Sequence, residues 1–256
     1  MQISNAAMHA KKLLNELGWS EPKDMTMQDI AWACGLMVTR KEMDGCEGRI
    51  LTSKDAGIIT INSNITYQPK INYILAHEIG HSKLHRDISF FSDNHKTLAD
   101  WYAKGTHESE ANQFAAELLL PSNLFLDRVK RRKLSVQLIE DTAGYFGASK
   151  TATFLRYRDL GDFPLMVVFI EKGLIKWKTC SKDFPFQWLL LKSKLPEWSV
   201  AGDYYYKSIE GNAPEKINAI DWFPEDYRAQ KDESQQLWEQ CFPASKDSIV
   251  TCLWTL

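Results

Sequence analysis

Apolar residues recur every three or four positions through the first part of the chain, and this spacing predicts amphipathic helices because such positions share one helical face. Ser4 is the expected N-cap of the first helix and Gly18 its end, while Pro69 fits the first turn of a longer helix. The predicted helices cover residues 6–17, 27–35, 69–85, 98–104, 108–119, 123–131, 136–146 and 149–160. The N-terminal part is therefore expected to be mostly helical.

Short runs rich in β-branched residues, separated by turn signals such as Asp44-Gly45, predict strands. The first three runs lie close together in the sequence and are expected to form a small antiparallel sheet. The later runs follow Asp162, where the chain changes character and six of its nine tryptophans are found. The predicted strands cover residues 36–39, 49–52, 58–61, 165–170, 174–179 and 248–254. We therefore divide the chain into a domain over 1–161 and a second domain over 162–256.

Composition and charge narrow the class of protein. Hydrophobic residues make up 44% and charged residues 25% of the 256 positions, as in globular proteins. A net charge of -2 gives no whole-chain attraction to nucleic acid or to an anionic membrane. No apolar run is long enough to span a bilayer, the first residues lack the apolar core of a secretory signal, and the five cysteines include no C-x-x-C pair. We expect a cytoplasmic protein that does not associate with membranes.

The strongest chemical signal is His77-Glu78-Ile79-Gly80-His81, an H-E-x-x-H pattern inside a predicted helix. Residues four apart share a helical face, so His77 and His81 can bind one zinc ion. Glu78 is then placed to act as the catalytic base, which takes a proton from water and delivers it to a leaving amine. The pattern leaves manganese or iron open as the metal.

A catalytic zinc site needs a third protein ligand and one open position. Asp87 stands where the extended pattern H-E-x-x-H-x-x-G-x-x-H needs its last histidine, so we seek the third ligand in a later helix. Glu108 shares a helical stripe with alanine and leucine and is expected to face inward, whereas its rival Glu110 shares one with Glu117 and is expected to be solvated. Asn112 could hydrogen-bond a ligand histidine from the second shell of the site, or serve a simple surface or capping role.

Two separated motifs together resemble the ImmA/IrrE family of zinc metallopeptidases, because they agree with it in order and spacing. The first runs from His77 to His85 and the second from Glu108 to Pro121. The resemblance covers about residues 69–121, and the flanking segments to about residue 160 are compatible with it. It implies a zinc ion, Zn²⁺, held by His77, His81 and Glu108, with Glu78 as the catalytic base.

The expected fold class is α+β. The resemblance implies a zincin-like, mostly helical peptidase core that includes the small antiparallel sheet. A helix-turn-helix-like segment over 136–160 and an α+β, aromatic-rich C-terminal domain are expected to follow it. The resemblance also implies a biological role, since members of the family typically act on, or are paired with, helix-turn-helix transcriptional repressors in mobile elements and stress responses. The C-terminal domain is a candidate for sensing a signal or presenting the substrate.

Several nearby side chains have open roles. His85 extends the histidine face by one turn and is interpreted as structural or substrate-facing, because a fourth protein ligand would close the site to water. His107 is either a partly exposed residue at a helix start or a group that stabilises the oxyanion or docks substrate. Tyr73 and Tyr102 are further candidates for stabilising the oxyanion, and the sequence does not rank them.

Two hypotheses about function follow. The leading one is a zinc-dependent endopeptidase that hydrolyses a peptide bond in a cytoplasmic regulatory protein, a helix-turn-helix repressor. The alternative is a non-proteolytic regulator with a structural or vestigial metal site, which binds a repressor or DNA. Direct DNA binding draws its support from the basic run at 130–133 and the helix-turn-helix-like segment after it, but a short basic run is usually a solvated helix end.

Overall fold

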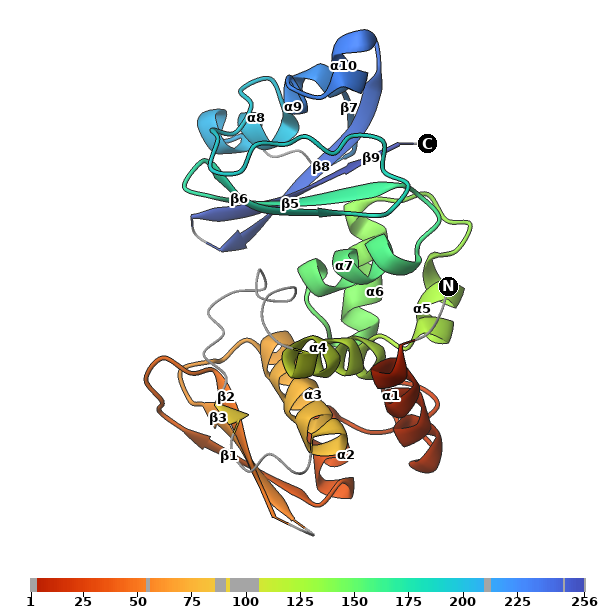
Figure 1. Cartoon of the computed structure of the whole chain (residues 1–256), viewed down its shortest axis with the longest axis vertical. Coiled ribbons are helices and arrows are strands. Elements are labelled where there is room, and N and C mark those ends of the chain that lie inside the picture. The colour runs from red at the N-terminus through yellow and green to blue at the C-terminus, as the bar shows by residue number, and fades with distance from the viewer. Residues whose placement is uncertain are drawn as a thin grey trace. The chain divides into compact units, whose positions relative to one another are not determined.

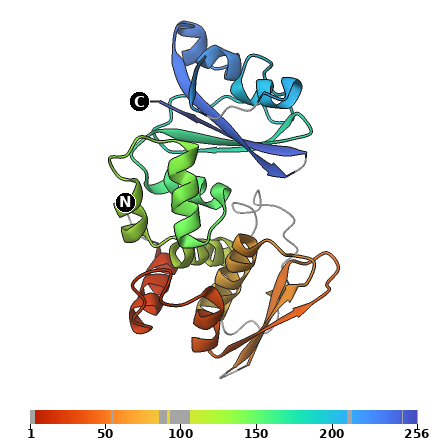
Figure 2. The same cartoon turned by 180° about the vertical axis from the view of Figure 1, so that it is seen from behind.

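The computed structural model describes residues 4–53, 56–85, 91–92, 106–209, 213–245 and 247–255 (Figure 1, Figure 2). It has the mixed α+β composition that the sequence predicts. The chain forms two compact units, one of residues 1–125 with 143–149 and one of residues 126–142 with 150–256. This division groups residues 126–142 and 150–161 with the C-terminal part of the chain, so the domain boundary at 161 stays a prediction.

Helices make up most of the first unit. Its elements α1, α2, α3 and α4 match four of the predicted helices, and α1 is capped as expected, with the Ser4 hydroxyl accepting from the Ala7 N–H at 3.2 Å. Thr26 and Asp29 form a reciprocal capping box at the start of α2. The predicted helix at 98–104 lies outside the described residues. The helices span Asn5–Glu16 (α1), Met27–Ala33 (α2), Gln68–Leu84 (α3) and Thr106–Leu119 (α4).

A four-stranded sheet in the order β1-β3-β2-β4 lies against α3. Its strands span Leu36–Lys41 (β1), Gly48–Thr52 (β2), Gly57–Asn62 (β3) and Phe91–Ser92 (β4). Alternation along the strands buries Ile50, Ile59 and Ile61 and leaves Leu51 and Ile58 partly exposed, as expected for a sheet with one covered face. The buried side chains of the sheet therefore include those that pack against α3.

The prediction of a purely antiparallel sheet is wrong at one pairing, because β1 and β3 run parallel. The segment 42–47 carries the chain from the end of β1 past β3 to the start of β2. The Asn62 side chain holds this segment by donating to the carbonyl oxygens of Met43 at 2.6 Å and Cys46 at 2.9 Å. The β2–β3 hairpin is antiparallel as predicted, so the crossing leaves β1 beside β3 and in the same direction.

The segment after α4 contains three further helices, which confirm the helical predictions at 123–131, 136–146 and 149–160. They are α5 (Ser122–Val129), α6 (Val136–Phe146) and α7 (Lys150–Leu160). A DNA-recognition helix needs exposed side chains that enter the major groove. The second helix of this pair instead has most of its side chains buried, namely Thr151, Ala152, Thr153, Phe154, Leu155, Tyr157 and Arg158. Helix α7, all of whose residues are described, therefore lacks the exposed recognition face that the DNA-binding alternative requires.

The second unit is built around an antiparallel sheet in the order β6-β5-β9-β8-β7. Short helices pack on one face, where Trp222 and Phe223 are fully buried with Met166 and Val168 of the sheet. The sequence predicted the strands at 165–170, 174–179 and 248–254 but not β7, β8 or the short helices. The elements span Leu165–Glu171 (β5), Leu174–Cys180 (β6), Val200–Lys207 (α8), Glu215–Asn218 (β7), Ala219–Trp222 (α9), Tyr227–Lys231 (α10), Gln236–Ser245 (β8) and Ser248–Trp254 (β9).

Among the described residues, no helix combines the length and the apolar character that crossing a bilayer requires.

Candidate metal centre

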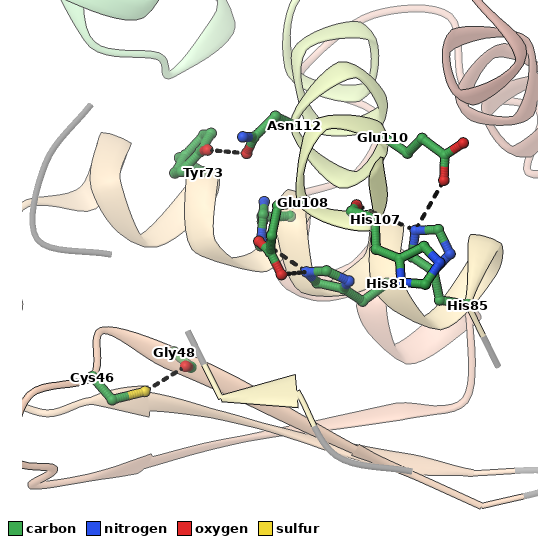
Figure 3. Close-up of polar contacts among 10 residues, drawn as sticks. Cys46, Gly48, Tyr73, His81, His85, His107, Glu108, Glu110 and Asn112 are labelled. Atoms are coloured by element: carbon green, nitrogen blue, oxygen red, sulfur yellow. Dashed lines mark hydrogen bonds and ion pairs between the residues drawn. The ribbon is translucent and has the colours of Figure 1, made fainter. Parts of the chain in front are cut away.

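Helices α3 and α4 bring together the three side chains that the sequence proposed as metal ligands (Figure 3). His77 and His81 lie one turn apart on α3, and Glu108 lies in the first turn of α4. The two Nε2 atoms are 3.0 Å apart, and Glu108 approaches them with Oε2 at 3.3 Å from His77 and Oε1 at 3.4 Å from His81. One potential ligand atom from each of the three residues thus lies within 4.8 Å of the others.

These separations fit a small divalent ion. Ligand atoms bonded at about 2.0–2.1 Å to a tetrahedral zinc ion lie about 3.3–3.4 Å from one another, close to the 3.0–3.4 Å found here. Burial lowers the pKa of His81 to about 4, although Glu108 acts in the opposite direction. A metal ligand must offer an unprotonated imidazole nitrogen, so this shift favours the ligand form at neutral pH. The donor set therefore suits a zinc-sized ion.

Glu78 lies beside the histidines on α3 and is 1% exposed. Burial raises its pKa to about 7, with His77 lowering it and Glu108 raising it further. Its Oε2 atom has no hydrogen-bond partner among the described residues. A buried carboxyl group whose pKa is close to neutrality can both accept a proton and give it back, which is the chemistry of a general acid–base group.

Two glycines allow the elements of the site to approach closely, and the sequence analysis assigned neither of them a role. A Cβ atom on Gly48 of β2 would lie 2.4 Å from Ile74 Cγ2 and 3.1 Å from Glu78 Oε1, so only glycine lets this strand lie against the base. A Cβ atom on Gly80 would lie 3.2 Å from the Ala111 carbonyl oxygen on α4. An isolated glycine inside a strand signals close backbone approach, but the predicted strand begins at residue 49, one residue after Gly48, so this signal was missed.

Asn112 is hydrogen-bonded to Tyr73, and its proposed contact with a ligand histidine stays a prediction. Its Oδ1 accepts a hydrogen bond from Tyr73 Oη at 2.6 Å, and Asn112 is 3% exposed, which makes a simple surface role wrong (Figure 3). Burial, followed by the charge of Glu108, raises the pKa of the Tyr73 hydroxyl, so it remains protonated and donates. Its contact with Asn112 directs the Tyr73 hydroxyl proton away from an oxyanion role. The other candidate for that role, Tyr102, lies outside the described residues.

His85, His107 and Glu110 meet on the other side of the three ligand residues. His85 Nε2 is 3.5 Å from Glu110 Oε2 and 3.3 Å from the His107 carbonyl oxygen, and the two imidazole rings are 4.3 Å apart. The Glu110 side chain is 46% exposed, as the helical stripe predicted. Glu117 on the same stripe was expected to be solvated, which is wrong: it is 2% exposed because its Oε1 accepts from the backbone N–H and hydroxyl of Ser122.

The comparisons with known proteins agree with this arrangement. An α+β unit whose central helix carries the H-E-x-x-H pattern, with a glutamate from a second helix, is the type of site found in metallopeptidases. Residues 33–157 match the family model of a peptidase family described as the IrrE N-terminal-like domain. This part of the chain belongs to that family, which confirms the resemblance to ImmA/IrrE proteins.

Two individual proteins are similar to the chain. The "Uncharacterized immunity region protein 2" of Bacillus phage phi105 is 40% identical over 63 residues, which are 25% of this chain and 37% of the phage protein. The chain thus spans about a third of the length of that relative. A solved structure of a "Mycobacterium tuberculosis transcriptional regulator" is 16% identical, with a TM-score of 0.62 over 98% of this chain and 77% of that one. At this identity the likeness shows a shared fold.

Proposed function

We propose that the protein is a zinc-dependent endopeptidase that hydrolyses a peptide bond in a regulatory protein. The observation that carries this proposal is the meeting of His77, His81 and Glu108 directly beside the buried carboxyl group of Glu78. The match of residues 33–157 to a peptidase family supports the same chemistry. A structural zinc site would have four protein ligands, whereas the described residues offer three in this cluster, the number found in catalytic sites that keep one position for water or substrate.

The residues of the chain have distinct roles in the proposed reaction. His77, His81 and Glu108 would hold the zinc ion, which when bound would supply Lewis acidity toward water and the scissile carbonyl group. The Glu78 carboxylate accepts a proton from the attacking water, and the water oxygen forms a bond to the carbonyl carbon. The carbon–nitrogen bond then breaks, and Glu78 delivers the same proton to the leaving nitrogen. Burial raises the pKa of Glu78 above that of an exposed glutamate, which makes its carboxylate a stronger base.

The proposed substrate is a helix-turn-helix transcriptional repressor in the cytoplasm. The phage relative carries the words "immunity region" in its name, and the protein with the similar fold is called a transcriptional regulator, which places both in a regulatory context. No disulfide joins any of the five cysteines, as expected in a reducing compartment. The buried side chains of α7 leave it without a recognition face for DNA among the described residues.

The test is cleavage of a repressor encoded beside the protein, followed by mass spectrometry of the fragments. The zinc-loaded protein is expected to cut the repressor at one position, a chelator is expected to stop the reaction, and Glu78→Gln is expected to retain zinc but lose cleavage. An intact repressor held in a stable complex by the zinc-loaded protein would contradict the proposal and support the non-proteolytic alternative. Substantial cleavage by Glu78→Gln would exclude Glu78 as the base.

A further inference from the structure

The helical line that carries the two histidines continues toward the start of α3. Tyr73 lies one turn before His77 on this line, and its ring is 5.9 Å from the His77 ring. On α4, Asn112 lies one turn after Glu108. The bond between Tyr73 Oη and Asn112 Oδ1 therefore links the two helices about one helical turn, or about 5.4 Å, from the ligand layer.

We propose that Tyr73 and Asn112 are positioning residues that set the place of the third ligand, Glu108, relative to His77 and His81. This inference rests on the proposed zinc-dependent function. At 2.6 Å the bond is short, and its acceptor is buried, with Asn112 3% exposed. The bond is partly buried, with its acceptor on the buried side, so it is partly shielded from competition with water and can hold the two backbones at a defined separation and register.

Glu108 needs such support more than the histidines do. The side chains of His77 and His81 are 2% and 1% exposed, so packing fixes them, whereas the Glu108 side chain is 24% exposed. A glutamate side chain also has several rotatable bonds. The position of its carboxylate therefore depends on how α4 is placed against α3.

The apolar contact between the helices does not supply the register on its own. Gly80 lets α3 approach the Ala111 backbone, but this apolar contact adds no directional bond between the helices. On the far side of the ligand layer, His85 pairs with Glu110, whose side chain is 46% exposed, so solvent weakens this pair. Among the described residues, the link between Tyr73 and Asn112 is a directional contact between the two helices whose acceptor is buried.

The experiment removes the bond from either end in the full-length protein. Tyr73→Phe deletes only the hydroxyl group, and Asn112→Leu replaces the amide by an apolar group of similar size. Zinc affinity is measured by competition with a chromophoric chelator below the onset of unfolding, and the visible spectrum of the Co²⁺-loaded protein reports the ligand geometry. Tyr157→Phe is the matched control, because it removes the hydroxyl of a fully buried tyrosine that lies in the other unit.

Each single variant is expected to weaken zinc binding by about tenfold or more, the usual effect of losing a residue that orients metal ligands. The double variant is expected to be little weaker than the singles, because one bond is lost in all three. The Co²⁺ spectrum should change in these variants and stay unchanged in Tyr157→Phe. Unchanged zinc affinity and Co²⁺ spectrum in Tyr73→Phe, with only a lower unfolding temperature, would overturn the inference and leave a structural role.

The same measurements separate this inference from the proposed function. If the unaltered protein takes up no zinc, the proposed function fails and the inference fails with it. If the unaltered protein binds zinc and cleaves its substrate while Tyr73→Phe and Asn112→Leu bind zinc equally well, the function stands and only the positioning role is refuted.

Discussion

Gly48 is the position where a single added methyl group tests the construction of the site most directly. In Gly48→Ala the new Cβ would lie 2.4 Å from Ile74 Cγ2 and 3.1 Å from Glu78 Oε1. Carbon atoms in favourable contact are about 3.5–4.0 Å apart, so β2 and α3 must separate by roughly 1 Å. We expect this displacement to destabilise the first unit and to move the Glu78 carboxylate away from its working position.

The magnitude follows from two opposing effects. Overpacking a core by one carbon costs about 1–3 kcal/mol, while replacing glycine by alanine restricts the unfolded chain and stabilises by about 0.4–1 kcal/mol. The net expectation for Gly48→Ala is a loss of about 1–2 kcal/mol, or a fall of about 2–8 °C in unfolding temperature for a chain of this size. The rate of cleavage should fall by more than the loss of folded protein would cause, because misplacing a reacting group by about 1 Å can slow a reaction about a hundredfold.

Gly144→Ala is the matched control for this prediction. It makes the same chemical change inside α6, where a Cβ would meet nothing within 4 Å. Alanine favours the helical state over glycine by up to about 1 kcal/mol, so this variant should unfold at a higher temperature and cleave normally. Thermal unfolding and the repressor-cleavage assay are run on both variants. The steric reasoning is refuted if Gly48→Ala is as stable as the unaltered protein and cleaves at the same rate.

Three further predictions concern the ligand set and the second unit. Glu108→Ala should lose bound zinc at chelator concentrations at which Glu110→Ala keeps its zinc. Metal analysis that shows the reverse order would assign the third ligand to Glu110 instead of Glu108. Burial raises the pKa of Asp226, but the backbone N–H groups of residues 188, 187 and 228 lower this pKa more, so the net shift is downward. The ionised Asp226 therefore stabilises the folded protein above the unfolded-state pKa near 3.8, and this stabilisation is lost as the pH falls through the pKa of Asp226 in the folded protein. Urea unfolding from pH 6 to pH 3 should show the gap between the unaltered protein and Asp226→Asn closing at low pH, and a constant gap would contradict this. Glu239 is 0% exposed and accepts hydrogen bonds from two backbone N–H groups, an indole and a hydroxyl; Glu239→Ala should destabilise the second unit by about 3–5 kcal/mol without changing zinc affinity, which calorimetry and chelator competition would check.

The sequence predicted the elements of the first unit well because their signals are local. The cap at Ser4 and the helical spacing through α3 and α4 each depend on residues a few positions apart. The parallel pairing of β1 with β3 was missed because it depends on a long-range contact, in which the Asn62 side chain holds the crossing segment. Periodicity alone carries no information on such a contact.

The second unit shows where periodicity fails. β8 carries Glu239 and Gln240 at buried positions, so its pattern of polar residues does not resemble that of a core strand. These side chains are satisfied by partners far away in sequence, such as the Val200 N–H for Glu239 and the Val136 N–H for Gln240. The short helices α9 and α10 have four and five residues, which is too few to establish a helical period.

At the candidate site, the chemistry of the ligands and the close packing of α3 on α4 are two separate requirements for binding an ion. The ligand types and their helical spacing indicated His77, His81 and Glu108, and the structure brings these together. Gly80 lies between the two ligand histidines and is small for a different reason: it is the point where α3 contacts the Ala111 backbone. Without that approach Glu108 would stand too far from the imidazoles to share an ion with them. A larger residue at position 80 should therefore weaken metal binding although it touches no ligand atom, which makes packing between α3 and α4 as much a condition of the proposed chemistry as the ligands.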